Sequence, residues 1–144
     1  MTAYPAKFEK AEEGGYVVEF IDIPSCVTEG DTLEEAKLMA KEALSGVLAS
    51  MDSRKIKIPE STAIAKDHPE FDDIHYIEPD LKIAFAISLK QERERQGLTQ
   101  KEVARRMQVN WTFYQRIENP RKSNPTLATI EKLEHVFSRR FFAL

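Results

Sequence analysis

The stretch Leu98–Glu118, LTQKEVARRMQVNWTFYQRIE, decides the fold of the C-terminal half of this chain. Thr99 stands where it can cap a helix that runs to Gln108, and Asn110 can cap a second helix after a tight turn. Apolar residues recur at steps of three and four on both segments, so each helix has one side to bury. Two short helices joined in this way are typical of a helix-turn-helix, whose second helix enters the major groove of DNA.

The outward side of the second predicted helix carries a polar stripe. The stripe consists of Thr112, Gln115, Arg116 and Asn119. Side chains that are three, four and seven residues apart share one face of a helix, so these four are predicted to meet base edges together. Basic groups nearby, among them Arg121 and Lys122, are predicted to hold phosphates.

Charge is divided unevenly along the 144 residues, whose formal net charge is only −3. Residues 1–79 hold 8 Lys and Arg against 17 Asp and Glu, a net charge of −9, whereas residues 80–144 hold 13 against 7, a net charge of +6. A basic half suits an anionic partner such as DNA, and an acidic half suits a cationic one. For the acidic half alone, an ordinary solvated surface is an equal alternative.

Length and composition predict two small domains in the cytoplasm. No apolar run approaches the roughly 18 residues of a membrane span, and the N-terminus lacks the order of a signal peptide, so no membrane partner is expected. The single cysteine, Cys26, cannot form an internal disulfide and is expected to be a small apolar strand residue. His68, His75 and His135 lack the spacing of metal ligands, so neither a metal nor another cofactor is expected.

The N-terminal half begins with alternating residues. Tyr4, Ala6 and Phe8 follow the two-residue period of a half-buried strand. Gly14 and Gly15 can form a hairpin into a second strand, Tyr16–Ile21, because glycine adopts positive φ without a steric penalty. A third short strand, CVTEG, ends at Gly30, and the three are predicted to form an antiparallel meander.

The period then changes to that of a helix. Thr32 and Glu35 have the spacing of a capping box, and the helix is predicted to face the sheet with Ala36, Ala40, Ala43, Leu44, Val47 and Met51. Residues 52–73 are predicted to be a loop or hinge, followed by a fourth strand in IHYIEP. The expected fold class is therefore α+β: a small βββαβ domain over residues 1–79 and an all-α helix-turn-helix domain over residues 80–144.

The first domain resembles the HicB antitoxins of HicA–HicB toxin–antitoxin pairs. The residues that carry the resemblance are an opening Tyr-Pro strand, a Gly-Gly-Tyr hairpin, an Asp-x-Pro corner, a Thr-x-Gly strand end and a Thr-x-x-Glu-Ala helix start, in that order within residues 4–60. The resemblance implies a partial RNase H-like fold that binds and blocks HicA, a small basic ribonuclease. Ser25 departs from the family, since many members have glycine after the Pro of this corner.

An RNase H-like sheet raises the question of catalysis by clustered carboxylates and metal ions. Glu19 and Asp22 have opposite parity along their strand, so they should not face the same side, and no further acid completes a metal cage. No catalytic residue and no enzyme activity are therefore expected. The acids are instead predicted to face the basic nuclease, with Glu19, Asp22, Glu29 and Asp31 as the toxin-binding residues.

The second domain resembles Cro/repressor-type (Xre-like) DNA-binding proteins over residues 83–137, through LTQKEVARRM, RIEN and NPTLATIEKLEHVF. The resemblance implies that Gln100 grips a phosphate and that Trp111, Thr112, Gln115 and Arg116 face bases or sugar-phosphate. Asn110 is included among the DNA-binding candidates. Trp111 is unusual at this position and alternatively stacks into the domain or its dimer. The turn glycine of the family is Gln108 here, which leaves the angle of the turn open.

The chain ends in the apolar segment SRRFFAL, which either folds back over its own core or pairs with a second copy. Pairing is favoured, because repressors of this class read two-fold operators as dimers, so a homodimer or higher even oligomer is expected.

Together these features predict an antitoxin that inhibits a HicA-like mRNA-cleaving ribonuclease and represses its own operon through double-stranded operator DNA. The alternative is a transcriptional regulator whose N-terminal domain senses a small ligand.

Overall fold

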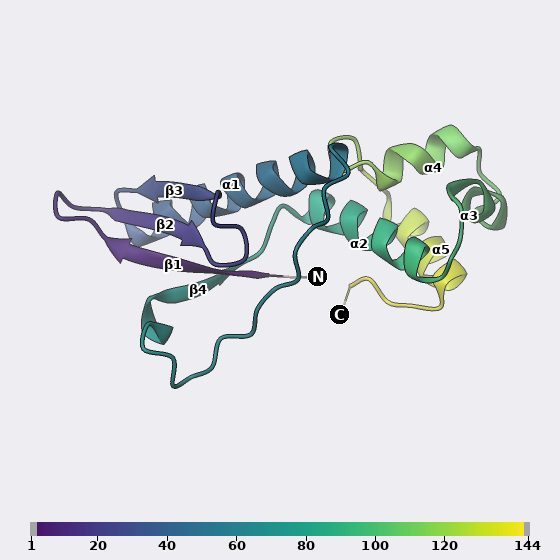
Figure 1. The fold of residues 1–144 in the computed structure, drawn as a ribbon. Coiled ribbons are helices and arrows are strands. Elements are labelled where there is room, and N and C mark those ends of the chain that lie inside the picture. The colour runs from purple at the N-terminus through teal and green to yellow at the C-terminus, as the bar shows by residue number, and fades with distance from the viewer. Residues whose placement is uncertain (1–2, 143–144) are drawn as a thin grey trace. The chain divides into compact units, whose positions relative to one another are not determined.

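The structure, a computed structural model, describes residues 3–142 and divides between Asp80 and Leu81 into two compact units. The N-terminal unit contains β1 (Tyr4–Lys10), β2 (Tyr16–Phe20), β3 (Val27–Gly30), α1 (Leu33–Ser53), the 3-10 helix η1 (Phe71–Asp73) and β4 (Ile74–Ile77). The C-terminal unit contains α2 (Leu81–Arg95), α3 (Gln100–Met107), α4 (Trp111–Glu118) and α5 (Leu127–Phe137). The predicted α+β class and the βββαβ order of the first unit are confirmed (Figure 1).

The N-terminal unit is built on a four-stranded antiparallel sheet in the order β3-β2-β1-β4. The first three strands form the predicted meander, and β4 returns to the free edge of β1, pairing Ala6 with His75. Alternate residues point to opposite faces, so one face presents Tyr4, Ala6, Phe8, Val18 and Phe20, which are all buried.

Helix α1 packs along that buried face (Figure 1). Thr32 caps α1 by accepting a hydrogen bond from the Glu35 N–H, which confirms the predicted cap, and the Glu35 carboxylate accepts from the Asp31 N–H at 3.2 Å. Ala36, Ala40 and Leu44 are buried as predicted. The rest of the buried side is Ser45, Leu48 and Ala49, whereas Ala43, Val47 and Met51 lie at its margin.

Several boundaries differ from the predictions. Strand β2 ends at Phe20 rather than at Ile21. Helix α1 continues through Asp52 and Ser53, because no helix breaker precedes Lys55, whose φ of 56° ends the regular backbone. The predicted loop therefore begins at Arg54 and ends at η1. Cys26 lies just before β3 rather than within it, although it is buried as expected for a small apolar side chain.

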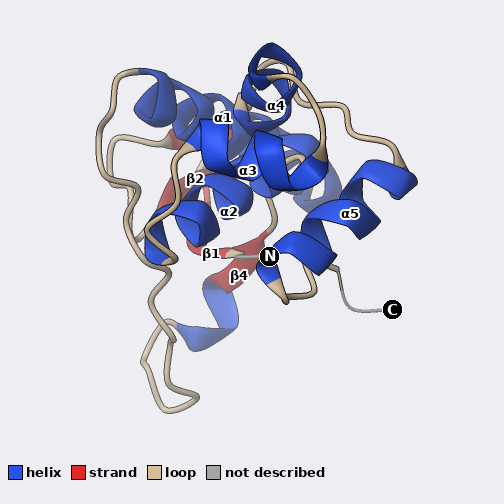
Figure 2. Cartoon of the chain, turned by 90° about the vertical axis from the view of Figure 1, so that its right-hand side faces the viewer, coloured by secondary structure: helices blue, strands red, loops and turns tan. Residues whose placement is uncertain are grey.

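The C-terminal unit consists of helices joined by turns and loops, with no strand among its described residues, as Figure 2 shows for α2–α5. Its core is a cluster of buried side chains contributed by all four helices and by the segment after α5. The members are Phe85, Leu89, Val103, Ala104, Met107, Tyr114, Ile117, Leu133, Phe137 and Phe141. Across residues 3–142, no helix combines the length and apolar character that a membrane span requires.

The C-terminal segment packs on its own unit through Phe141 and Phe142, which is the less favoured of the two alternatives expected from the sequence. Pairing of two copies stays a prediction. The ring of Phe142 stacks on Phe85 with 5.6 Å between centroids, and Phe141 is buried. The Phe141 N–H donates to the Glu134 carboxylate at 2.7 Å, which fixes the backbone where it turns back. Ala143 and Leu144 lie outside the described residues.

Candidate functional site

Helices α3 and α4 form a helix-turn-helix with a cap at each joint. Thr99 accepts from the Glu102 N–H at the start of α3, and Asn110 accepts from the Phe113 N–H at 2.7 Å at the start of α4. Between them, Gln108 adopts a left-handed conformation with φ 60° and ψ 41°. Gln108 thus occupies the position of the usual turn glycine of Cro/repressor-type proteins. It adopts the left-handed conformation itself.

The inner side of α4 is tied to the core, which leaves its outer side free. Tyr114, Ile117 and Glu118 are buried, whereas Thr112 and Arg116 are exposed and Gln115 is partly exposed. Thr112, Gln115 and Arg116 therefore do share the predicted outward side of one helix.

Asn119 departs from the predicted stripe because it lies just after α4, in an extended conformation. Its side chain accepts from the Arg121 N–H at 3.0 Å, as that of Asn110 accepts from Phe113, so both asparagines already bond to backbone. Arg121 and Lys122 are exposed in the turn that follows.

A buried ion pair joins α2 to the end of α4. Arg93 donates from Nε and Nη2 to the two carboxylate oxygens of Glu118 at 2.8 and 2.7 Å, and from Nη1 to the Leu98 carbonyl oxygen at 2.8 Å. Such a two-bond fork fixes orientation as well as distance. The pair therefore holds the helix-turn-helix against α2.

Gln100 and Trp111 lie together at the junction of α3 and α4. The indole Nε1–H of Trp111 donates to Gln100 Oε1 at 3.2 Å, and Gln100 Nε2 donates to Glu118 Oε1 at 3.2 Å. The Lys101 Nζ lies 4.7 Å from the centroid of the Trp111 ring. This arrangement gives Gln100 two protein partners, so a phosphate is not needed to explain its position.

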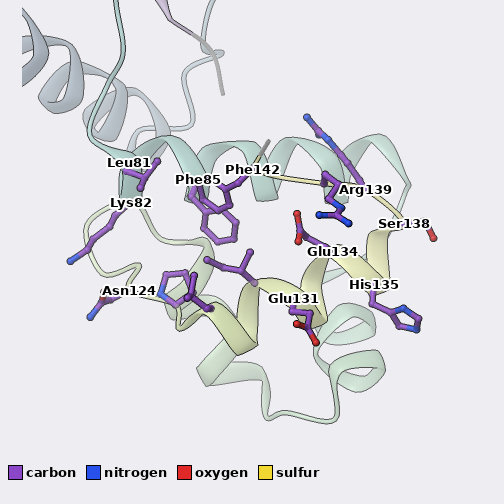
Figure 3. Close-up of a pocket in the computed structure, with 14 residues that line it drawn as sticks. Leu81, Lys82, Phe85, Asn124, Glu131, Glu134, His135, Ser138, Arg139 and Phe142 are labelled. Carbon is purple, nitrogen blue, oxygen red and sulfur yellow. The ribbon is translucent and has the colours of Figure 1, made fainter. Parts of the chain in front are cut away.

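An open groove lies beside α2 and α5 in the same unit, with a volume of about 1110 Å³. Leu81, Phe85, Ile130 and Phe142 line it with apolar groups, and charged side chains such as Glu131 stand at its margin (Figure 3). Leu127, also in the lining, is 85% exposed.

The open face of the N-terminal sheet combines apolar and acidic side chains. Val17 on β2 is paired with Glu9 on β1 and Glu29 on β3, and Glu19 is paired with Val27. These five side chains are all exposed, with Val17 at 39% and Val27 at 54%. Lys7, the β1 neighbour of Glu19, lies on the same face and forms an ion pair with Glu70 at 2.7 Å. The two exposed valines and three carboxylates form a mixed patch beside this pair, which we call the acidic sheet face.

Asp22 does not belong to the acidic sheet face in the structure. Both of its carboxylate oxygens accept hydrogen bonds from Thr62, one from the backbone N–H and one from the side-chain hydroxyl. The Tyr76 hydroxyl accepts from the Ile64 N–H and donates to the Thr62 carbonyl oxygen, and Tyr4 donates to the Pro59 carbonyl oxygen. Asp22, Tyr76 and Tyr4 therefore hold the segment 59–64 in place together.

Asp31 lies directly after β3 and is exposed. Within residues 3–142, no three His, Cys, Asp or Glu side chains gather as metal ligands would.

Comparison with known proteins places both units in described families. Residues 3–70 match the family described as "HicB_like antitoxin of bacterial toxin-antitoxin system", and residues 89–142 match the helix-turn-helix family. The protein named Antitoxin HicB of Escherichia coli (strain K12) is 36% identical over 104 residues, which cover 72% of this chain and 71% of that protein. The chain belongs to the HicB antitoxin family. Antitoxin HicB 1 of Photorhabdus laumondii is also 36% identical, over 83% of this chain and 72% of its own length.

Solved HicB structures are similar over part of the chain. The Burkholderia pseudomallei antitoxin HicB has a TM-score of 0.48 and 21% identity, covering 57% of this chain and 66% of that one. A chain in a structure named "HicA3 and HicB3 toxin-antitoxin complex" has a TM-score of 0.44 and 22% identity, covering 54% of this chain and 98% of that one.

Several features of this HicB-family chain were missed from sequence. Glu9 shares the open face with Glu19 and Glu29, a position that the two-residue alternation of β1 could have indicated. The exposed Val17 and Val27 could have been found in the same way. The contact of Gln100 with Trp111 had no such signal, because it depends on how α3 crosses α4.

Proposed function

We propose that this HicB-family chain is an antitoxin with two partners. Its N-terminal unit binds and inhibits a HicA-like mRNA-cleaving ribonuclease, and its C-terminal unit binds operator DNA and represses its own operon. Membership of the HicB family and the helix-turn-helix support the two roles. We assign the chain no catalytic residue and no cofactor, and we place its action in the cytoplasm as an even-numbered oligomer.

The acidic sheet face carries the proposal for the toxin. Glu9, Glu19 and Glu29 surround Val17 and Val27 on a surface that α1 leaves uncovered. The carboxylates suit a basic nuclease surface that otherwise holds phosphates, and they speed its encounter at low salt. The valines supply apolar area that loses water in the complex and so slows dissociation.

The two other acids predicted for the toxin have different places in this proposal. Asp31 lies next to the acidic sheet face and contributes to its field. Asp22 acts indirectly, because its carboxylate already holds Thr62.

The proposed DNA surface is the outward side of α4 with the turn after it. Thr112, Gln115 and Arg116 face the bases of the major groove, and Arg121 and Lys122 hold phosphates. Asn110 and Asn119 keep the ends of α4 in shape through their backbone bonds, so they support this surface from its edges. Two copies on an inverted repeat would place the half-sites about one helical turn apart, or a multiple of it.

Co-expression in bacteria tests the toxin role with the whole chain. The partner is the product of the adjacent open reading frame, which this proposal expects to be a short basic protein, and the readout is growth after its induction. Wild type should restore growth, whereas Glu19→Lys with Glu29→Lys should slow association about tenfold or more at low salt and weaken rescue.

The matched control is Glu34→Lys with Glu42→Lys, which reverses two exposed acids on α1 away from the sheet and should leave rescue intact. If wild type is folded and soluble yet neither restores growth nor binds the basic protein, the toxin role is wrong.

A further inference from the structure

Trp111 is the first residue of α4 and remains 43% exposed, although it makes two defined contacts. Its only polar atom, the indole Nε1–H, donates to Gln100. The Lys101 ammonium lies over its ring. The indole therefore has no donor left for a base or a phosphate, and the cation occupies space on one side of the ring. The exposed remainder of the side chain is apolar.

Gln100 is the residue type that this junction requires. The indole of Trp111 can only donate a hydrogen bond, and the ionised carboxylate of Glu118 can only accept one. The glutamine amide accepts from the first through Oε1 and donates to the second through Nε2, both at 3.2 Å. Since Glu118 is buried and held by Arg93, Gln100 connects the exposed indole to a rigid ion pair.

We propose that Trp111 reads the C5-methyl group of a thymine and that Gln100 is its positioning residue. The inference rests on the proposed binding of DNA by α4, and it names a determinant of specificity within that site. A recognition helix meets base edges with its N-terminal residues, where Trp111 lies. Among the groups that base pairs present in the major groove, the thymine methyl is the apolar one. The exposed part of the indole has no free hydrogen-bond donor, so it suits an apolar contact with the thymine methyl group.

The same geometry changes the role of Gln100. A phosphate would have to compete with Trp111 and Glu118 for its amide, whereas Lys101 keeps a charged ammonium next to the ring. Gln100 thus sets where the indole points, and the nearby cation is the better phosphate partner.

Deoxyuridine substitution tests the contact, because deoxyuridine differs from thymidine only by the missing methyl group. The full chain first selects a preferred duplex from a random-sequence pool, and each thymine is then replaced singly. For the wild type, one thymine in each half-site should weaken binding by about fourfold when its methyl is removed, the value expected for one buried methyl group. Trp111→Ala should bind the thymine and deoxyuridine duplexes equally at that position.

Two further variants separate positioning from folding. Gln100→Leu keeps the bulk of the side chain but removes both hydrogen bonds, so it should reduce the deoxyuridine effect at that position and raise the rotational freedom of the indole. Trp111 is the only tryptophan, so time-resolved fluorescence anisotropy reports this side chain alone. Phe113→Ala removes an equally exposed aromatic group, at 43%, from the same helix. It should leave unchanged the loss of affinity that deoxyuridine causes at the thymine contacted by Trp111.

The outcomes separate this inference from the function on which it rests. If the wild type selects a sequence but no thymine methyl matters, or if Trp111→Ala keeps the full effect, the thymine contact is wrong while DNA binding stands. If Gln100→Leu keeps both the full effect and the indole mobility of wild type, Gln100 is not a positioning residue. If the full chain selects no sequence at all, the proposed operator binding is wrong and the inference fails with it.

Discussion

Gly30 lies against the backbone of Ala36, where β3 meets the start of α1. A Cβ atom on Gly30 would lie 2.4 Å from the Ala36 nitrogen and 2.6 Å from its Cα, distances at which backbone must move. The close approach lets α1 cover the sheet directly after its capped first turn.

Gly30→Ala should therefore destabilise the N-terminal unit by about 1–3 kcal/mol, the usual cost of overpacking. Gly46→Ala is the matched control, because Gly46 lies in α1 with open space around its Cβ position and should gain about 1 kcal/mol from helix propensity. Urea unfolding followed by circular dichroism measures both. Equal stability of the two variants would contradict the close approach.

Breaking the Arg93–Glu118 pair should strongly destabilise the C-terminal unit. Glu118→Ala leaves the Arg93 guanidinium, with only 12% of its side chain exposed, without its carboxylate, at an expected cost of about 3–5 kcal/mol. Trp111 fluorescence during urea unfolding follows this unit. Glu70→Ala, which breaks the partly exposed Lys7–Glu70 pair of the other unit, should leave that transition unchanged.

Glu92 should make the C-terminal unit sensitive to acid. Hydrogen bonds from Arg95, Gln96 and Arg139 lower the pKa of the Glu92 carboxyl from 4.5 to about 2, against the opposing effect of its burial. A pKa lower in the folded state means that the stabilisation is complete above about pH 4.5 and is lost as the pH falls towards 2. Arg95 and Arg139 are exposed, so solvent weakens their interactions with Glu92. We therefore expect ionised Glu92 to contribute about 2 kcal/mol to the free energy of unfolding.

The Glu92→Gln variant should lack the Glu92 contribution to the free energy of unfolding at pH 7. Its free energy of unfolding should also decline less between pH 4.5 and pH 2. Glu131→Gln, which replaces an exposed acid of α5, should keep the pH profile of the wild type. If the free energy of unfolding of Glu92→Gln declines as steeply with pH as that of the wild type, other groups cause the acid sensitivity.

Asp22→Ala should release the segment 59–64 rather than weaken toxin binding directly. Loss of the hydrogen bonds to Thr62 costs about 1 kcal/mol net, so local opening and proteolytic cleavage near Thr62 should rise roughly fivefold. Glu19→Ala should leave the cleavage rate unchanged. Unaltered cleavage in Asp22→Ala would return Asp22 to the predicted toxin surface.

Arg116 and Lys122 should contribute differently to DNA binding. Arg116→Ala should weaken the selected duplex by about 1–3 kcal/mol and relax the preference at one base pair, because a base contact carries sequence information. Lys122→Ala should weaken all duplexes alike and reduce the dependence of affinity on salt. Competition binding against random duplex checks both, and a uniform loss in Arg116→Ala would move this residue to the phosphate contacts.

Local chemistry was readable from the sequence. The caps at Thr32, Thr99 and Asn110 each depend on a side chain and a backbone N–H three residues away, so their positions follow from short-range order. Hydrophobic period and turn residues similarly indicated the meander, the fourth strand and the two helices of the helix-turn-helix.

The tertiary structure alone decided how distant residues meet. Asp22 bonds to Thr62 across 40 positions, Arg139 reaches Glu92 across 47, and Trp111 finds Gln100 only because α3 crosses α4. Such contacts depend on the packing of whole elements. A polar side chain that the sequence predicts to bind a partner can therefore already be hydrogen-bonded within the protein. The sequence by itself therefore determined the elements and the charge of each half, whereas packing selected which acids and polar groups remain available to a partner.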